Sequence, residues 1–594
     1  MTAPAIADYG LIGDLRTAAL VSRDGGVDWC CLPRFDSGSV FGAILDPDRG
    51  GTWTIRPAGP YTSAQRYRPG TNILETVFET PDGGRVELTD FMPVTPDGRP
   101  DGPHPEIHRQ LRGVQGAVEM ELVFDPRFEY GTRGTRLEVL GAGIFASDRT
   151  DQVVTLASAR PFDWTVGAAG ARARFVLESG DARWLVLRYD DDDVHPVDRY
   201  NSAAKLAATE AFWLGWTGAI TYAGPWREAV ERSALVLKLL THAETGGIVA
   251  APTTSLPEVI PGGRNWDYRF VWLRDAAFAL AALDAVGQHA EADEFMRFLK
   301  RVCRHEGGGH LQIMYGLDGR RDLVERPLDH LAGYRGARPV RVGNGAAGQL
   351  QLDVYGEVVA TADIWRRRHP MSDGAWRILR GMVDWVSGNW HRPDSSIWEV
   401  RGEPRHYVFS KVMSWVALDR GLRIAADLGL PADTVAWTAA RDALRADILA
   451  HGWSDRCGSF VQAYGEDALD AATLVIPLVG FLPWDDPRVA GTVRAVAQEL
   501  TAPDRALVYR YRNGDGLDGH EGAFVTCSFW LAEALAGIGD RSAATHVFER
   551  TLAYASPLGL FAEELDPATG EFLGNFPQAL SHIALINAAA ALAR

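Results

Sequence analysis

The sequence predicts two domains, an N-terminal β-sandwich followed by an (α/α)6 barrel. Three observations lead to this fold class. The chain has 594 residues, more than a single ordinary domain holds. Residues 1–200 contain many short segments of β type, and the residues beyond 201 contain segments with helical spacing. Strands followed by helices, without alternation, indicate two segregated domains rather than one parallel sheet.

Short runs of β-branched and aromatic residues characterise the first part of the chain. Examples are 85–89, 153–156 and 184–189. Clusters of Gly, Pro and Asp, such as 24–26 and 81–84, separate these runs and predict turns. Many short strands at regular spacing favour an all-β sandwich, which we assign to residues 1–200.

Helical spacing begins at Ser202, and we assign residues 201–245 to a helical linker and residues 246–594 to the barrel. Loops rich in Gly, Pro and Asp divide this part into about a dozen helical stretches. Twelve helices paired as antiparallel hairpins are what an (α/α)6 barrel needs. The pocket of such a barrel lies at one end, where the connecting loops converge. The predicted helices are 226–241, 274–286, 289–303, 344–367, 373–389, 407–427, 433–451, 467–478, 485–501, 522–537, 541–554 and 577–593.

Composition and charge exclude several classes of partner. A hydrophobic content of 46% and a charged content of 23% are typical of a soluble globular protein with a large core. The net charge of −17 argues against nucleic acid, whose phosphates need a basic surface, and against an anionic membrane face. A neutral partner such as a sugar is compatible with this charge.

Two features of the chain bear on its location. The N-terminus has neither a basic start nor an apolar run, and no stretch reaches the roughly 18 apolar residues of a membrane span. The cysteines are odd in number and scattered, so we expect reduced thiols. These features predict a cytoplasmic protein without a membrane anchor.

The segment 264–275 combines aromatic and charged residues in a way that suits sugar binding. It holds four aromatic residues, two acids and three arginines within twelve positions, just before a predicted helix. A pyranose ring offers apolar C–H faces and a rim of hydroxyls, which match aromatic faces beside Arg and Asp. The same charges could instead form salt bridges between the two domains, with Asp275 near a helix N-terminus.

Two other segments supply carboxylates. In 396–405, Glu399 directly follows Trp398, and apolar neighbours raise the pKa of a carboxyl group and keep it protonated. In 561–570, Glu563 and Glu564 are consecutive, and on extended backbone they point in opposite directions, so at most one faces a pocket. Glycoside hydrolysis needs two carboxylates, one that protonates the leaving oxygen and one that activates water or attacks carbon.

At this point a resemblance to a known family becomes specific. The chain resembles the glucoamylase-type enzymes of glycoside hydrolase family 15, which include glucoamylases, glucodextranases, isomaltose-releasing α-1,6-glucosidases and some bacterial trehalases. The family's fold, a β-sandwich joined by a linker to an (α/α)6 barrel, agrees with the prediction above. The resemblance covers nearly the whole chain, and its motifs are 6–14, 27–37, 254–258, 264–275, 397–402 and 574–582.

The resemblance implies roles for individual residues. Glu399 corresponds to the general acid and Glu563 to the general base of an inverting hydrolase, and Glu564 points away from the pocket. Arg274 and Asp275 resemble the pair that holds the outer hydroxyls of the non-reducing glucose.

Five aromatic or basic residues complete the substrate-binding set that the resemblance implies. Tyr268 resembles the tyrosine beside the reacting carbon, and Arg510 resembles an arginine of the same subsite. Tyr334 takes roughly the place of a pocket tryptophan in fungal glucoamylases, although a tyrosine departs from that pattern. Trp272 and Trp398 lie within the matched motifs and are expected to contact the sugar.

The predicted activity is exo-acting hydrolysis of short α-glucosides with release of β-glucose. The catalytic pair does not distinguish α-1,6, α-1,4 and α,α-1,1 linkages. We favour isomaltose- or maltose-type oligosaccharides, with α,α-trehalose as the alternative. From other classes, an inverting α-glucoside phosphorylase would lack the base, and a non-catalytic sugar-binding protein would lack one of the two glutamates.

No cofactor or metal is expected. Residues 343–348 spell GxGxxG, but a dinucleotide site needs a βαβ unit, and this string opens a helix in an all-helical region. We therefore expect it to let a helix start approach the pocket closely. His305 and His310 are five residues apart rather than the four that place two ligands on one helical face, and residues 307–309 are glycines.

Overall fold

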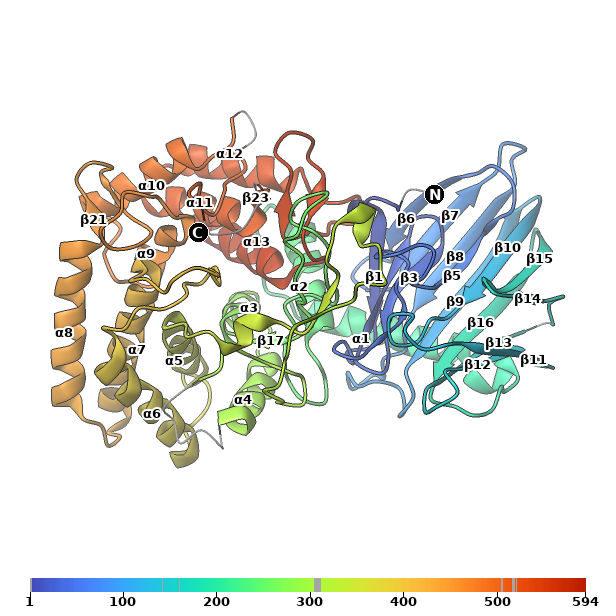
Figure 1. Cartoon of the computed structure of the whole chain (residues 1–594), viewed down its shortest axis with the longest axis horizontal. Helices are drawn as coiled ribbons and strands as arrows, with labels where there is room; N and C mark the ends of the chain where they lie inside the picture. Colours follow the sequence, from blue (N-terminus) through green and yellow to red (C-terminus); the bar gives the residue numbers. More distant parts are fainter. Residues whose placement is uncertain are drawn as a thin grey trace.

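The computed structural model of the chain has two domains side by side, with strands at one end of the molecule and helices at the other (Figure 1). The predicted fold class, a β-sandwich followed by an (α/α)6 barrel, is confirmed. The structure describes residues 3–141, 143–159, 161–303, 311–503, 506–514, 519 and 521–594.

Two antiparallel sheets form the N-terminal domain. Its strands are β1 (Tyr9–Gly13), β2 (Ala18–Ser22), β3 (Gly26–Cys31), β4 (Ser39–Phe41), β5 (Thr52–Pro57), β6 (Thr62–Tyr67), β7 (Leu74–Glu79), β8 (Arg85–Phe91), β9 (Glu106–Gln115), β10 (Ala117–Asp125), β11 (Arg136–Leu140), β12 (Gly143–Ser147), β13 (Val153–Ser158), β14 (Thr165–Gly167), β15 (Gly170–Glu178) and β16 (Ala182–Tyr189). One sheet has the order β1-β2-β3-β5-β10-β15-β14, with β4 paired to β3. The other has the order β11-β12-β13-β16-β9-β8-β7-β6.

Alternation along the strands builds the core between the sheets. In β5, Trp53 and Ile55 are fully buried and alternate with partly exposed residues, as expected for a strand with one face inside. The core also holds a charged pair, since Arg109 Nε donates to Asp90 Oδ1 at 2.8 Å. The other guanidinium N–H groups donate to the carbonyls of Trp53 and Gly25, so the buried charge is satisfied.

Thirteen α-helices make up the rest of the fold among the described residues: α1 (Ser202–Gly218), α2 (Arg227–Leu240), α3 (Leu273–Ala285), α4 (Ala290–Cys303), α5 (Asp353–Trp365), α6 (Asp373–Asn389), α7 (Val408–Leu428), α8 (Thr434–His451), α9 (Val475–Leu478), α10 (Pro487–Glu499), α11 (Val525–Gly537), α12 (Arg541–Leu552) and α13 (Ala579–Leu592). Helices α3, α5, α7, α9, α11 and α13 form an inner ring, which closes where α13 packs against α3. The even-numbered helices from α2 to α12 pack outside it. Inner helices such as α13 are apolar nearly all round, because protein surrounds them.

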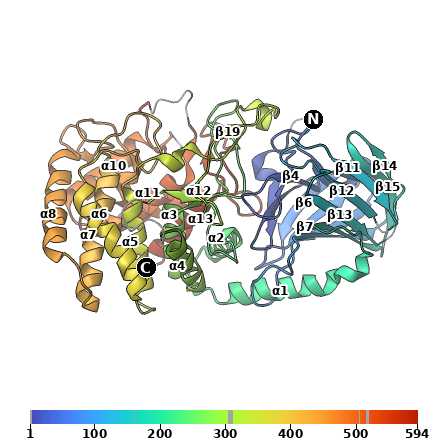
Figure 2. The ribbon, with the colours of Figure 1, turned by 60° about the horizontal axis from the view of Figure 1, so that its bottom comes forward.

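Helix α1 bridges the domains. It runs beneath the sandwich toward the barrel in Figure 2. Helix α2 also falls within 201–245, the range assigned to a linker, and there it packs against α13 as part of the outer ring. The division at residues 200 and 245 therefore remains a prediction.

Two predicted helices are shorter in the structure. In place of a helix over 344–367, a 3-10 turn over Gly345–Gly348 precedes α5, which begins at Asp353. The two glycines disfavour an α-helix there. In place of 467–478, a 3-10 turn over Ala471–Leu474 leads into the single turn of α9, and Gly480 at φ +74° follows.

One buried ion pair lies at the junction of the two domains. Arg269 donates from Nε and Nη2 to the two carboxylate oxygens of Asp267 at 2.8 and 2.7 Å. Its Nη1 donates to the Ser37 carbonyl of the sandwich at 2.7 Å. The guanidinium carbon lies 5.4 Å from the ring centre of Tyr130 and 5.8 Å from that of Trp29. Both domains therefore surround the same guanidinium.

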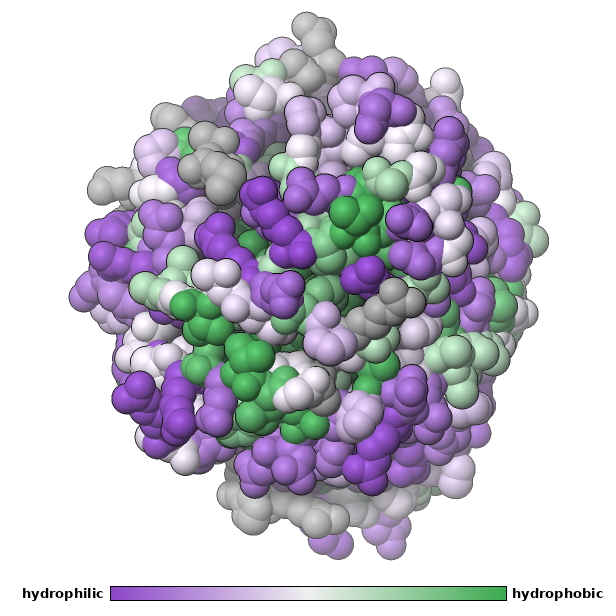
Figure 3. All heavy atoms as spheres, turned by 90° about the vertical axis from the view of Figure 1, so that its right-hand side faces the viewer, coloured by the Kyte–Doolittle hydropathy of each residue, from purple (hydrophilic) through white to green (hydrophobic). Residues whose placement is uncertain are grey.

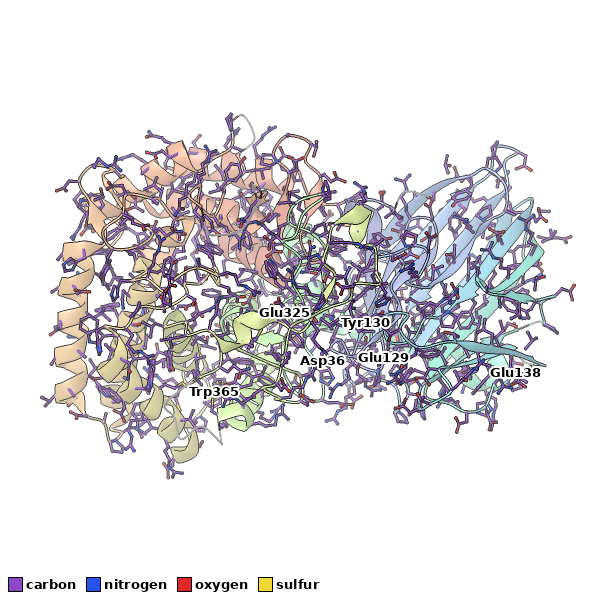
Figure 4. All side chains as sticks on the ribbon, viewed as in Figure 1. Asp36, Glu129, Tyr130, Glu138, Glu325 and Trp365 are labelled. Carbon is purple, nitrogen blue, oxygen red and sulfur yellow. The ribbon has the colours of Figure 1, made fainter. Side chains whose placement is uncertain are left out.

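Further contacts make this junction continuous. Arg320 of the barrel pairs with Asp36 of the sandwich at 2.5 Å, and Trp29 Nε1 donates to the Pro252 carbonyl at 2.7 Å. Figure 4 shows Asp36, Glu129 and Tyr130 at the junction, with Glu325 close by on the barrel side. These contacts fix this end of the barrel against the sandwich.

The outer end of the sandwich is mostly hydrophilic, with separate apolar groups (Figure 3). The exposed large apolar side chains of its described strands are Val114, Val139, Leu140, Val166 and Val176. Among the residues that the structure describes, we find no helix with the length and apolar character needed to cross a membrane.

The domain junction yields a stability prediction. Asp267→Ala leaves the Arg269 guanidinium buried without its carboxylate, which costs about 3–5 kcal/mol of unfolding free energy. Glu138→Ala is the control, because Glu138 and its partner Arg136 are both about half exposed, and such pairs contribute about 0–1 kcal/mol. Urea unfolding of both variants measures the difference. Equal losses would contradict the role given to the buried pair.

Candidate active site

A cavity lies at one end of the barrel, where the N-terminal ends of α3, α11 and α13 meet the loops before α5 and α7. It encloses about 770 Å³, including open solvent at its mouth. Its lining residues are Ala250, Glu258, Arg264, Trp266, Tyr268, Trp272, Arg274, Asp275, Asn344, Ile397, Trp398, Glu399, Val400, Arg401, Arg510, Tyr511, Glu521, Phe524, Glu563, Gln578 and Leu580.

Side chains of the segment before α3 face alternately the cavity and the sandwich. On extended backbone, successive side chains point to opposite sides. The odd-numbered Asp267 and Arg269 reach the sandwich, as described above. The ion pair of this segment lies within it, and Arg269 joins it to the sandwich by a hydrogen bond to the Ser37 carbonyl, while sugar binding by the cavity side remains a prediction. The residues of even number that line the cavity are Arg264, Trp266, Tyr268, Trp272 and Arg274.

Glu399 is held by Trp272 and Arg274. Trp272 Nε1 donates to Glu399 Oε1 at 2.6 Å, and Arg274 Nη2 lies 3.6 Å from the same oxygen. Burial raises the pKa of the Glu399 carboxyl, although Arg274 and the Trp272 hydrogen bond oppose that shift. The backbone of Glu399 is left-handed, with φ +58°, in a tight turn in which its N–H donates to the Ser396 carbonyl. Such conformations cost about 1–3 kcal/mol and gather at functional sites.

Glu563 lies on the segment that leads into α13. Tyr268 donates its hydroxyl to Glu563 Oε1 at 2.6 Å, and Gln578 Nε2 donates to the same oxygen at 3.3 Å. No described side chain donates to the other oxygen, Oε2. Burial raises the pKa of Glu563 to about 7, against the lowering effects of Arg510 and Tyr268. Gly574, at φ +75°, gives this carboxylate room, because a Cβ there would lie 2.5 Å from Oε2.

Arg274 and Asp275 form the closed end of the cavity. Arg274 Nε lies 3.1 Å from Asp275 Oδ2, and Arg274 Nη1 donates to the Ile397 carbonyl at 2.9 Å. Both side chains are buried, in the first turn of α3. Their remaining polar atoms are charged and fixed in direction, which suits recognition of sugar hydroxyls.

Arg510 lies among carboxylates on the opposite wall. Its Nη2 lies 2.7 Å from Glu521, 3.5 Å from Glu258 and 3.6 Å from Glu564. Glu564 does not line the cavity, as expected from its alternation with Glu563, and its Oε2 accepts from the backbone N–H of Gly522. Burial raises the pKa of both Glu258 and Glu564 well above the usual value. A protonated share of this cluster balances its excess of negative charge.

Trp398 connects this wall to Glu399. Its indole Nε1 donates to Asp470 Oδ1 at 2.9 Å, and the guanidinium carbon of Arg510 lies 5.4 Å from its ring centre. The ring is therefore fixed on both its polar edge and its face.

Tyr334 is the one expected site residue that the structure does not bring to the cavity. Its ring is fully buried, and its hydroxyl donates to the Pro4 carbonyl at 3.0 Å. It lies in a 3-10 turn beside Gly333, where a Cβ would lie 1.7 Å from the Ala337 oxygen. This corrects the expectation, because the loop turns the tyrosine toward the N-terminal segment instead of toward the cavity.

Several lining residues escaped the sequence analysis. Arg264 and Trp266 could have been found, because they share the even-numbered register of Tyr268. Arg401 and Glu521 give no comparable signal, since only the folded loops bring them to the cavity. Asn344 lines the cavity at the start of its 3-10 turn, in agreement with the close approach expected for residues 343–348.

The arrangement offers two carboxyl groups with raised pKa values in one cavity, together with aromatic and guanidinium groups. Such a pair can give a proton to one reacting atom and take a proton from another. Within the described ranges, no group of three or more His, Cys, Asp or Glu residues could hold a metal ion. His305 and His310 lie outside the described residues.

Comparison with known proteins adds to this geometry. Residues 224–590 match the model of Glycosyl hydrolases family 15, and residues 1–213 match a model described as Trehalase-like, N-terminal. A crystal structure of a bacterial glucoamylase complexed with acarbose has the same fold, with a TM-score of 0.75 at 12% identity over 99% of this chain and 94% of that one.

Full-length relatives agree with the family match. A trehalase of Mycolicibacterium smegmatis is 43% identical, over 98% of this chain and 91% of the relative. A trehalase of Thermoplasma volcanium is 38% identical, over 99% of this chain and 93% of the relative. Since the family model spans more than half of the chain and these relatives span nearly all of it, the protein is a glycoside hydrolase and belongs to glycoside hydrolase family 15.

Proposed function

We propose that the protein is an α,α-trehalase that hydrolyses trehalose with inversion, with Glu399 as general acid and Glu563 as general base. In the proposed reaction, Glu399 protonates the oxygen between the two glucose units. Glu563 removes a proton from a water molecule on the opposite face of the sugar ring, and that water attacks C1. The attacked unit leaves as β-glucose and the other unit as α-glucose.

The state of Glu563 is the observation that carries this proposal. Its Oε1 is occupied by Tyr268 and Gln578, whereas Oε2 accepts no hydrogen bond from a described side chain. Tyr268 and Gln578 therefore hold this carboxyl group in one orientation beside the cavity, as a general base that takes a proton from water requires. A phosphorylase would have no use for this group, and a binding protein would have no use for a pair of carboxyl groups with raised pKa values.

The environment of Glu399 supports the acid role. Burial raises its pKa, so the carboxyl group holds a proton to higher pH than an exposed glutamate does. Its side chain is 19% exposed toward the cavity, so the proton is accessible to a bound substrate. The Trp272 hydrogen bond fixes the carboxyl group in one orientation.

The relatives are the reason that we propose trehalose as the substrate. The full-length relatives described above are named trehalases, and the N-terminal family model is described as trehalase-like. They favour trehalose over the isomaltose- or maltose-type oligosaccharides that the sequence alone suggested. Recognition by hydroxyl-binding groups at the closed end, Arg274 and Asp275, serves any of these glucosides equally.

The substrate and the stereochemistry are tested together by proton NMR of trehalose, maltose and isomaltose digests in phosphate-free buffer. We expect trehalose to be cleaved and to give α- and β-glucose in equal amounts at early times. Release of α-glucose alone would contradict inversion. If maltose or isomaltose is cleaved preferentially, that disaccharide is the substrate in place of trehalose.

The two catalytic roles predict different responses to the leaving group. Glu399→Gln should lower trehalose kcat roughly 10²–10⁴-fold. The loss should be far smaller with α-glucosyl fluoride, because fluoride needs little protonation to leave. Glu563→Gln should lower turnover of both substrates, since both need an activated water. Wild-type turnover of trehalose by Glu399→Gln would remove Glu399 from the acid role.

Tyr268 should set the acidic limb of the pH profile. Its hydrogen bond lowers the pKa of Glu563, so Tyr268→Phe raises that pKa and leaves the base protonated up to a higher pH. A hydrogen bond to a charged group contributes about 1.5 kcal/mol, and one pKa unit corresponds to about 1.4 kcal/mol, so the limb of kcat/KM should move up by about one pH unit. Tyr67→Phe is the control, because this tyrosine bonds Leu11 in the sandwich. A limb that stays in place would contradict the coupling.

A further inference from the structure

We propose that Trp266 is the wall of the site for the second sugar, the one released as the leaving group, and that Glu325 positions it through Arg341 and Arg401. The inference rests on the proposed function for the identity of that sugar. It assigns a role in specificity to residues outside the catalytic pair.

The exposure of the lining residues indicates where the second sugar lies. Trp272, Arg274 and Asp275 are buried at the closed end, whose charged groups suit the hydroxyls of the reacting glucose. The lining residues that are partly or largely exposed are Trp266, Tyr268, Glu399, Val400, Arg401, Tyr511 and Glu521. Tyr268 and Glu399 belong to the proposed reacting centre, so we place the open side at the others, with Arg401 the most exposed. A disaccharide whose first ring fills the closed end must place its second ring beside these residues.

Trp266 is fixed in place at its backbone. Its carbonyl accepts from Ser255 N at 2.8 Å and from Asn575 Nδ2 at 2.9 Å. Arg341 Nη1 donates to the carbonyls of Gly263 and Asn265, just before the tryptophan, at 2.9 and 3.0 Å. The position of the indole is thus determined by three parts of the chain.

Two guanidinium groups cover the ring. The guanidinium carbon of Arg401 lies 4.5 Å from the ring centre of Trp266, and that of Arg341 lies 4.8 Å from it. Both distances are those of cation–π contacts. Arg401 is only two residues after Glu399, so one of the two arginines over the Trp266 ring belongs to the loop of the proposed acid.

Glu325 joins the two arginines. Its Oε2 lies 3.0 Å from Arg401 Nη2, and its Oε1 lies 3.3 Å from Arg341 Nε. Oε2 also accepts from the backbone N–H of Gly345 at 3.0 Å. Figure 4 shows Glu325 on the barrel side of the domain junction, and it is not among the residues that line the cavity. Because Glu325 does not touch the cavity, its effect on the second sugar must pass through the arginines.

A rigid wall on the open side selects the linkage on which a shared catalytic pair acts. The closed end recognises a glucose unit that all α-glucosides share. The leaving sugar differs between linkages in the face and edge that it presents, and a wall fixed by ion pairs accepts some of these orientations and rejects others.

The experiment compares trehalose with α-glucosyl fluoride, which has no second sugar. We expect Trp266→Ala to lower kcat/KM for trehalose roughly 10–100-fold, as the loss of a pocket contact does, with little change for the fluoride. Glu325→Gln should lower kcat/KM for trehalose roughly fivefold, because it weakens the two partly exposed ion pairs that position Arg341 and Arg401. Trp266→Phe should restore part of the loss.

Glu571→Gln is the matched control. Glu571 pairs with Arg335, whose guanidinium carbon lies 5.1 Å from the ring centre of Tyr334, so the control breaks a similar arrangement away from the cavity. It should leave both substrates unchanged. Equal losses on trehalose and the fluoride in the Trp266 and Glu325 variants would overturn the inference, because they would indicate general damage.

The experiment distinguishes a failure of this inference from a failure of the proposed function. If the wild-type enzyme does not cleave trehalose, the proposed function fails. The ratio of kcat/KM for the disaccharide to kcat/KM for α-glucosyl fluoride is then measured with whichever of maltose or isomaltose the enzyme cleaves. A selective loss on that disaccharide supports Trp266 as the wall of the leaving-sugar site, and an equal loss on both substrates overturns it.

Discussion

The buried pair of Arg269 and Asp267 is the interaction on which the site depends. It flanks Tyr268 in the segment before α3, and Ser37 and Tyr130 of the sandwich contact its guanidinium. A buried ion pair is weak evidence for stability, because desolvation offsets much of its attraction. Here the pair fixes which side chains of the segment face the cavity. A shift of this extended segment by one residue would exchange the cavity-facing and sandwich-facing side chains and would bury the wrong charges.

This constraint explains why a β-sandwich accompanies the barrel. The first turns of α3 and α13 and the loops around them line the cavity, but the segment before α3 has no helical hydrogen bonds to hold it. The sandwich provides partners for its odd-numbered side chains, and the cavity receives the even-numbered ones. The carboxylate of Glu563 then meets a tyrosine whose backbone is fixed on both sides by that pair.

The fold class and most helices could be predicted from periodicity and turn residues, since these are local signals. The glutamates and the arginine–aspartate pair of the site could be proposed from a resemblance of ordered motifs, and all of them line one cavity. Tyr334 could not be placed, because its direction depends on a glycine turn that packs against Pro4. The left-handed backbone of Glu399 and the bond from Glu325 to Arg401 were equally inaccessible, because they arise from contacts between distant loops.

The pKa shifts of the two glutamates point in the same direction, so direction alone does not assign acid and base. Burial raises both pKa values, that of Glu563 to about 7. Each turnover of the proposed cycle moves a proton from Glu399 to the leaving sugar and another from water to Glu563, so the pair ends with its protonation states exchanged and a proton must return before the next turnover. The roles of acid and base therefore follow from position and partners, with Trp272 holding one carboxyl and Tyr268 the other.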